Sequence, residues 1–286
     1  MNEDVTVVLI SHKSKDLIIN FIKEIYNKFR IIIIDNSNDK LLEKEIKLTY
    51  PNVTLKLIEN NGYGAAINYA SKLIKTNYFL VSNPDVEGLN EKNIINFVAA
   101  SSVLNDKFSS LGPRFLNTDP KSHVQSDQLI NIAEMKFISG ACMFFKKETF
   151  QILGGFDENF FLYFEESDFC FRAYKVNKNY QINSIKVKHH VGSSVFVSNY
   201  KEKIEIEKLR NWHFIWSKFY YYKKNYGQTY SLLYFIPTLL RILFRITIYT
   251  LIKNNKKREK YLIRFNGLFC SIRGLKSYKR LNKNNL

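Results

Sequence analysis

The first hundred residues alternate between short apolar runs and longer segments in which apolar residues recur at helical spacing. The runs predict strands over residues 5–11, 30–35, 53–59 and 78–82. The intervening segments predict helices over residues 14–27, 41–50, 64–75 and 91–104. Continuous apolar runs such as residues 31–34 are typical of parallel strands that are covered on both faces. The pattern therefore predicts an α/β fold with a mostly parallel central sheet flanked by helices.

After residue 106 the alternation becomes less regular. Strands are predicted at residues 109–115, near 137–145 and at 181–188, and a helix is predicted at 166–176. Residues 201–286 are predicted to form a helical extension that is rich in basic and aromatic residues.

Residues 231–252 within this extension are largely apolar, with interruptions at Pro237, Arg241 and Arg245. The stretch reaches the roughly 20 residues that a spanning helix needs, but each central arginine costs about 2.5–3.5 kcal/mol on insertion. We therefore expect a helix that lies in the membrane interface rather than one that spans the membrane. A helix that packs on the rest of the protein and exposes a basic face is the alternative.

The net charge of +17 is concentrated at one end of the chain. From residue 201 onward there are twenty Lys and Arg against four Asp and Glu, which leaves 23 bases and 22 acids before that point. Such a segment suits an anionic membrane surface, and its aromatic residues, including Trp212 and Trp216, are typical of the same interface. Basic segments with aromatic residues also bind nucleic acid. The aliphatic run over 232–252 favours lipid, so no nucleic-acid partner is expected.

Three scattered cysteines, Cys142, Cys170 and Cys270, are too few for a disulfide framework or a metal knuckle. They predict reduced thiols in a reducing compartment. The first residues have neither the basic region nor the apolar length of a secretory signal. The expected location is cytoplasmic, on the inner face of the cell membrane.

Polar residues follow the predicted strands, and in such sheets ligands bind beyond the carboxyl ends of the strands. They are Ser11 and His12, then Asp35, then Asn61, Gly62 and Tyr63, and finally Asn83 and Asp85. Asp35 could accept a hydrogen bond from a nucleobase, or belong to a polar turn that caps the next helix. Gly62 could let the backbone approach a diphosphate at a helix N-terminus, although an ordinary glycine turn fits equally well.

Asp85 follows Pro84 at the end of a predicted buried strand. A carboxylate held on such a turn can bind a hard divalent ion, such as Mg²⁺ or Mn²⁺, whose remaining ligands are water and phosphate oxygens. His189 follows the last predicted strand and could complete that site. The alternatives are an ordinary proline turn and a strand-end histidine that is satisfied by hydrogen bonds.

Three carboxylates, Glu165, Glu166 and Asp168, lie within four residues and among six Phe and Tyr side chains over residues 160–171. Carboxylates this close repel one another, which raises the pKa of at least one toward the range of a general base. Alternatively, they are first-turn acids that complement a helix dipole, with Asp168 and Arg172 as an i,i+4 pair.

In this order the motifs resemble those of the family 2 glycosyltransferases, and among these the bacterial rhamnosyltransferase-like branch. The resemblance covers roughly residues 5–200. It rests on the segments 7–12, 35–37, 60–64, 82–86, 139–142, 154–158 and 165–172, together with His189, Gly192 and Ser194.

The resemblance implies a GT-A fold with a nucleotide-sugar-binding half over 1–106 and an acceptor-binding half over 107–200, followed by the extension over 201–286. It implies a donor site formed by Ser11, His12, Asp35, Asn61, Gly62, Tyr63, Asn83 and Asp85, with a divalent metal held by Asp85 and His189. It implies an acceptor site formed by Gly140, Gly154, Gly155, Phe156 and Asp157. Glu166 would accept the proton of the acceptor hydroxyl, within a catalytic group that includes Glu165 and Asp168.

Two positions depart from the family pattern. Asn83 replaces the first carboxylate of the usual Asp-x-Asp motif, which puts metal dependence in doubt, and Glu166 replaces an aspartate. The expected function is inverting transfer of a sugar, such as a deoxyhexose carried on thymidine diphosphate, to a glycan or lipid-linked glycan. The alternatives are a non-catalytic sugar-nucleotide-binding homologue, a basic protein that binds nucleic acid or membrane, and a nucleotidyltransferase. The last would need a basic glycine-rich loop that residues 11–14 do not provide.

Overall fold

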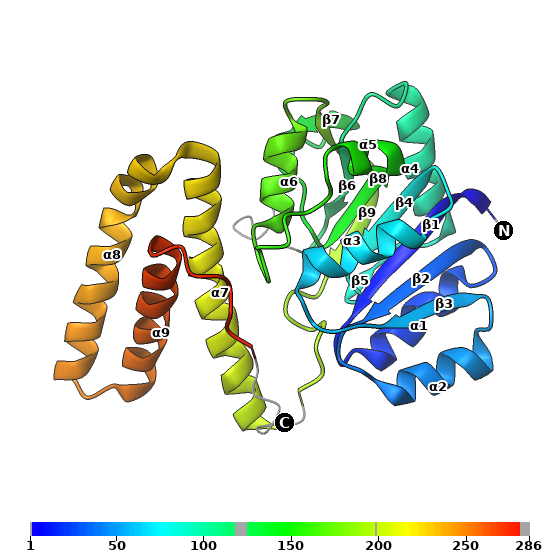
Figure 1. The fold of residues 1–286 in the computed structure, drawn as a ribbon. Coiled ribbons are helices and arrows are strands. Elements are labelled where there is room, and N and C mark those ends of the chain that lie inside the picture. The colour runs from blue at the N-terminus through cyan, green and yellow to red at the C-terminus, as the bar shows by residue number, and fades with distance from the viewer. Residues whose placement is uncertain (1, 118–124, 198, 281–286) are drawn as a thin grey trace. The chain divides into compact units, whose positions relative to one another are not determined.

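The computed structural model describes residues 2–117, 125–197 and 199–280 (Figure 1). The chain folds into two compact units. Met1–Asp157 and Glu165–Phe196 form the first, which we call the sheet unit, and Glu158–Phe164 and Val197–Leu286 form the second, the helical unit. The short segment 158–164 therefore belongs with helices that come about forty residues later in the chain, although sequence analysis had placed it in the first domain.

Strands and helices alternate through the first part of the sheet unit, as the pattern of apolar residues predicts. The first half contains β1 (Asn2–Ser11), α1 (Lys15–Ile25), β2 (Phe29–Asp35), α2 (Lys40–Thr49), β3 (Val53–Leu57), α3 (Tyr63–Leu73), β4 (Tyr78–Ser82), β5 (Val86–Glu87) and α4 (Glu91–Val103). The second half contains β6 (Ser110–Phe115), β7 (Ile132–Met135), β8 (Cys142–Lys146), α5 (Lys147–Ile152), α6 (Glu165–Ala173) and β9 (Asn179–His189). The pattern did not predict the short elements β5, β7 and α5.

Among the described residues, nine strands form one sheet in the order β3-β2-β1-β4-β8-β6-β9-β5, with β7 also paired to β9. The pairs from β3 to β4 are all parallel. Beyond β4 the sheet is mixed, because β8 runs antiparallel to both of its neighbours while β6 and β9 are parallel. The α/β class is confirmed, and its mostly parallel character holds for the first half of the sheet.

The four consecutive isoleucines of β2 show how both faces of the sheet are buried. Ile31 and Ile33 pack into one core with residues of α1, α2 and α4. Ile32 and Ile34 point the opposite way, into a second core with residues of α3, α5 and α6. Since side chains alternate across a strand, a continuous apolar run can be buried only between two layers of helices.

The helical unit consists of α7 (Tyr200–Tyr226), α8 (Gln228–Leu251) and α9 (Asn255–Ile272) around a small apolar core. Helices α7 and α9 approach closely at Gly267, where a Cβ atom would lie 2.7 Å from the carbonyl oxygen of Trp212. The indole of Trp212 donates a hydrogen bond to Asn266, at 2.7 Å. The segment 158–164 joins this unit because Phe160 packs against the ring of Tyr220.

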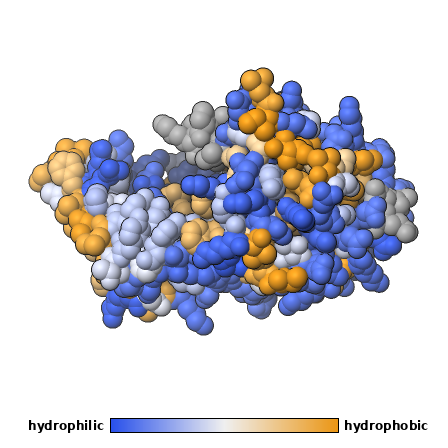
Figure 2. Space-filling model, turned by 90° about the horizontal axis from the view of Figure 1, so that it is seen from above, coloured by the Kyte–Doolittle hydropathy of each residue, from blue (hydrophilic) through white to orange (hydrophobic). Residues whose placement is uncertain are grey.

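Helix α8 exposes much of its apolar surface. Among the described residues it is the one helix that is long and apolar enough to cross a membrane, and 17% of its most apolar window is buried. Its buried side chains Phe235, Ile242 and Tyr249 mark a single face, and Leu233, Leu240, Phe244 and Leu251 on the opposite face are all more than half exposed. Figure 2 shows orange surface at the left edge of the molecule, where α8 lies in Figure 1.

Candidate active site

The turn that follows β4 places Asp85 against the end of β9. The amide of Asn83 donates to the carbonyl of Ala141, at 2.8 Å, and the amide of His190 donates to the carbonyl of Asp85, at 3.1 Å. Val86 pairs directly with His189 in the sheet. The turn is therefore fixed by backbone hydrogen bonds to β9 and to the loop before β8.

The carboxylate of Asp85 is buried, with 3% of the residue exposed. Its Oδ2 atom accepts a hydrogen bond from Ser194 at 2.8 Å. Its Oδ1 atom has no hydrogen-bond partner and lies 3.4 Å from Nε2 of His189. Burying a carboxylate oxygen without a hydrogen bond costs free energy. This oxygen and the neighbouring Nε2 atom of His189 together form a suitable pair of ligands for a divalent ion.

No cluster of three or more His, Cys, Asp or Glu side chains that could hold a metal ion occurs within the part of the chain that the structure describes. Asp85 and His189 would supply two ligands, and the others would be diphosphate oxygens and water. This donor set fits a metal that arrives with a nucleotide. Asn83, which replaces the first carboxylate of the usual Asp-x-Asp motif, is part-buried at the start of the same turn.

Two glutamates occupy the first turn of α6 in different environments. Glu165 is 5% exposed, and its Oε2 atom has no hydrogen-bond partner. Burial, and then the nearby charge of Glu166, raise the pKa of Glu165 well above its ordinary value. Glu166 is half-buried and accepts a hydrogen bond from Ser167 at 3.1 Å. Burial thus disfavours the charged form of Glu165, and its neighbour Glu166 is more accessible.

Tyr63 connects α3 to these acids. Its hydroxyl donates to the carbonyl of Gly140, at 2.9 Å. Burial raises the pKa of the Tyr63 phenol well above its ordinary value, and the charges of Glu165, Glu166 and Asp85 add to the shift. The phenol of Tyr63, at the start of α3, therefore lies within the charge environment of three carboxylates, which come from the turn after β4 and from α6.

Gly140 leaves room for Glu166. A Cβ atom at Gly140 would lie 3.3 Å from the Cβ and Cγ atoms of Glu166, which is a tight contact. The structure thus brings Gly140, predicted in the acceptor site, next to the predicted base.

The contacts of Asp168 differ from those of Glu165 and Glu166. It is fully buried, and its Oδ2 atom accepts from Nε of Arg172 at 2.8 Å. The same guanidinium donates to the carbonyls of Leu153 and Gly155, at 2.5 and 2.6 Å. This geometry matches the alternative role for Asp168, the i,i+4 pair, and the pair holds the loop before α6 in place.

The predicted acceptor residues of that loop have mainly structural contacts. Gly154 and Gly155 adopt positive φ angles of 75° and 65°, which glycine tolerates. Phe156 is buried in the core among other phenylalanines, and its backbone exchanges two hydrogen bonds with the side chain of Asn68. Asp157 is half-buried at the end of the segment.

The loops after β1, β2 and β3 meet at one edge of the sheet, since Ser11 pairs with Asp35 and the amide of Asn36 donates to the carbonyl of Ser11. His12 bonds to the side chain of Asn36 at 2.7 Å, and Asn36 donates to Asn60 at 3.3 Å. Among the predicted donor residues, Gly62 caps α3 with φ at 110°, and Asn61 is exposed.

Asp35 is fully buried, and its carboxylate accepts from Ser37 and from the amide of Asp39. In this structure it orders its own loop, as in the polar-turn alternative. Asn36 and Asn60 lie within the motifs at 35–37 and 60–64, but the sequence assigned them no role, because a loop asparagine carries no distinctive signal until its partner across the sheet edge is known.

Comparisons with known proteins identify a family for part of the chain. Residues 6–98 match the family model for Glycosyl transferase family 2. This segment is therefore a glycosyltransferase family 2 domain. The chain is also similar to the low-salt glycan biosynthesis hexosyltransferase Agl10 of Haloferax volcanii. That relative is 26% identical over 204 residues, which cover 63% of this chain and 64% of the relative, so the match spans less than two thirds of the relative's length.

Solved structures share the fold of this chain at low sequence identity. S. aureus TarS 1–349 in complex with UDP-GlcNAc matches with a TM-score of 0.54 and 13% identity, over 98% of this chain and 94% of the other. GalNAc-T7 with UDP, GalNAc and Mn²⁺ matches with a TM-score of 0.55 and 12% identity, over 76% of this chain and 50% of the other. These likenesses concern the fold, and the predicted GT-A fold is confirmed.

Proposed function

We propose that this protein is an inverting hexosyltransferase that moves a sugar from a nucleoside diphosphate to a hydroxyl group of a glycan or lipid-linked glycan. The observation that carries the proposal is the Oδ1 atom of Asp85, buried without a hydrogen bond beside His189. It lies in the same charge environment as Glu165 and Glu166 around Tyr63. A diphosphate site and a candidate base therefore share one edge of the sheet.

The difference between the two glutamates supports Glu166 as the base. A general base must be ionised at the working pH, and burial disfavours the ionised form of Glu165 by raising its pKa. Glu166 accepts the proton of the acceptor hydroxyl as the oxygen attacks the anomeric carbon from the face opposite the leaving diphosphate. The bond to the diphosphate breaks as the new glycosidic bond forms, so the anomeric configuration inverts.

Asp85 and His189 would hold Mg²⁺ or Mn²⁺ against the diphosphate. When bound, such an ion neutralises charge on the leaving group. Asp85 then contributes its Oδ1 atom, while its Oδ2 atom stays fixed by Ser194. Tyr63 and the N-terminus of α3 lie where a diphosphate would approach the sheet edge.

The donor and the location are finer parts of the proposal. The Asn-Pro-Asp sequence at residues 83–85 resembles the rhamnosyltransferase branch most, which favours a deoxyhexose on thymidine diphosphate. In the cytoplasm, the exposed apolar face of α8 and the basic charge of the helical unit would hold the enzyme on an anionic membrane surface. Arg241 and Arg245 are both exposed and flank that face, which suits a helix that lies in the interface.

Thermal-shift binding of a panel of nucleotide sugars, with Mg²⁺, Mn²⁺ or EDTA, tests the donor site. We expect one donor to raise the melting temperature with metal, and Asp85→Ala to abolish that shift. Asp16→Ala is the matched control, because Asp16 is an exposed aspartate of α1 outside the candidate site. If no nucleotide sugar stabilises the protein under any condition, the proposal is wrong.

A further inference from the structure

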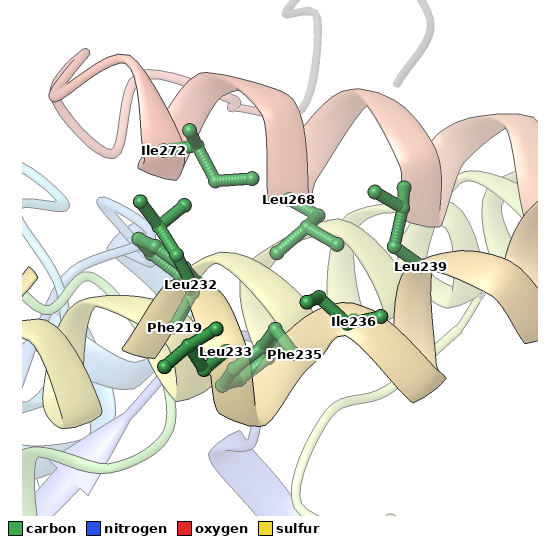
Figure 3. Close-up of a pocket in the computed structure, with 8 residues that line it drawn as sticks. All are labelled: Phe219, Leu232, Leu233, Phe235, Ile236, Leu239, Leu268 and Ile272. Atoms are coloured by element: carbon green, nitrogen blue, oxygen red, sulfur yellow. The ribbon is translucent and has the colours of Figure 1, made fainter. Parts of the chain in front are cut away.

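A pocket of about 170 Å³ opens among the three helices of the helical unit (Figure 3). The side chains that line it are all apolar and come from α7, α8 and α9: Phe219, Leu232, Leu233, Phe235, Ile236, Leu239, Leu268 and Ile272. A cavity of about 150 Å³ lined by such side chains stays dry and binds benzene. The pocket is therefore large enough for a short hydrocarbon segment and offers nothing to a sugar or a nucleotide.

The pocket is continuous with exposed apolar surface. Leu233 and Ile236 both line it and are 63% and 47% exposed, so the pocket wall is also part of the outer face of α8. Leu240 and Phe244 extend that face by two further turns and are 61% and 62% exposed. A chain that starts in the pocket could thus continue along α8 over apolar side chains.

Cations stand close to the pocket. The ammonium group of Lys218 lies 5.9 Å from the ring centroid of Phe235, which lines the pocket. Arg273 directly follows Ile272, also in the lining, and the ammonium group of Lys223 would lie 3.7 Å from a Cβ atom at Gly274. The sequence has no Asp or Glu from residue 208 to 258, nor after residue 259. A ligand of this pocket would therefore meet positive charge at the end where these cations lie.

Four tyrosines surround the turn between α7 and α8. Tyr222 and Tyr234 stack at 4.3 Å, and their hydroxyls share a hydrogen bond of 3.1 Å. Tyr226 and Tyr230 extend the group across the turn, with a centroid distance of 5.4 Å. Rings with an apolar body and a polar tip gather where a protein meets the boundary between lipid headgroups and chains.

We propose that this pocket binds one hydrocarbon chain of an anionic, phosphate-bearing membrane lipid, whose headgroup lies against Lys218, Lys223 and Arg273. The inference rests on the proposed membrane association, and it adds a defined site to what would otherwise be a surface contact. It makes the helical unit a receptor for one lipid molecule.

Isothermal titration of the full chain with dodecyl phosphate, below the concentration at which it forms micelles, tests the site. We expect saturable binding of one molecule per chain. Leu239→Trp fills the pocket and should weaken binding by at least about tenfold, because the chain loses its buried contacts. Leu243→Trp is the matched control, since Leu243 is an exposed leucine of the same helix that does not line the pocket. If Leu239→Trp does not fold, Ile236→Trp replaces it, because Ile236 is half exposed.

Arg273→Gln should weaken dodecyl phosphate binding and leave binding of dodecyl maltoside unchanged. Equal binding of dodecyl phosphate by Leu239→Trp and wild type would overturn the site. If inorganic phosphate binds as tightly as dodecyl phosphate, the site is an ordinary anion site and the proposal is wrong. If dodecyl maltoside binds as tightly as dodecyl phosphate, the proposed preference for an anionic lipid is wrong. Nucleotide-sugar binding by the same variants reports on the donor site separately, so the two proposals can fail independently.

Discussion

The two units of the chain bury and expose opposite kinds of groups. The sheet unit keeps carboxylates inside, with Asp85 and Glu165 each holding a buried oxygen without a hydrogen bond. The helical unit carries almost all of the net charge of the chain and leaves its apolar helix α8 exposed. Groups left unsatisfied in a fold are costly, so their position indicates where a ligand compensates. The contrast supports the proposals made above, of a polar ligand for the sheet unit and of a lipid for the helical unit.

Glu166→Gln is the sharpest test of this division and has the largest expected effect. The rate of sugar transfer should fall by about 10²- to 10⁴-fold, which is the usual contribution of a general base. Donor binding should remain, because Glu166 is proposed to act on the acceptor hydroxyl, and binding to anionic vesicles should remain, because it is proposed for the helical unit. Steady-state transfer assays and vesicle sedimentation measure the two properties.

The neighbouring substitution Glu165→Gln is the control. Because burial raises the pKa of Glu165 and disfavours its charged form, an amide of the same shape should change the transfer rate far less than Glu166→Gln does. A larger loss with Glu165→Gln would reverse the roles of the two glutamates.

The next largest effect should come from Arg172→Met, which leaves Asp168 buried without its partner. Breaking such a pair typically costs about 3–5 kcal/mol. Urea unfolding would measure the loss, and the double variant Asp168→Asn with Arg172→Met should recover part of it. If Asp168→Asn alone abolished transfer without changing stability, Asp168 would have the chemical role that sequence analysis gave it.

These acids show how far the sequence predicts the site. Helices and strands in the first half of the sheet unit follow from local patterns, and polar strand ends predict a ligand edge. That Glu165 and Glu166 differ in burial depends on packing against Gly64 and Gly140, which are far away in the chain. No pattern along residues 165–168 distinguishes these environments.

The sequence also did not predict the short elements or the pairing of segments that are far apart in the chain. Strand β7 has four residues and helix α5 has six, so neither shows enough periods to be recognised. The direction of β8 depends on which strands it joins. The placement of residues 158–164 likewise depends on distant residues, because their aromatic side chains pack against rings of α7.

His213 makes the stability of the helical unit depend on pH, which gives a further test of the comparison. It is buried in the helical unit, where its Nε2–H donates to the carbonyl of Lys279, at 2.8 Å, and Nδ1 accepts from Ser277, at 3.0 Å. Burial lowers the pKa of His213 to about 4 from an ordinary value of 6.5. The unfolded chain therefore binds more protons between these values, and stability falls as the pH drops from about 6.5 to about 4.

The loss should reach at most about 3 kcal/mol, because each pKa unit corresponds to roughly 1.4 kcal/mol. His213→Gln should flatten this part of the curve of unfolding free energy against pH. Nucleotide-sugar stabilisation at a fixed pH should be the same in the variant, since His213 belongs to the helical unit. An unchanged pH curve would show that the imidazole does not remain neutral in the fold.

The smallest predicted effect is a difference in stability between alanine substitutions at Gly154 and Gly155, two adjacent glycines of the sheet unit. Both have positive φ angles, but a Cβ atom at Gly155 would lie 2.5 Å from Oδ1 of Asn68, whereas nothing lies within 4 Å of one at Gly154. Gly154→Ala should therefore cost about 1–2 kcal/mol from backbone strain alone, and Gly155→Ala should cost more. Urea unfolding of the two variants measures the difference. Equal losses would mean that Asn68 moves aside, and then the loop before α6 would be less tightly fixed than its hydrogen bonds to Asn68 and Arg172 indicate.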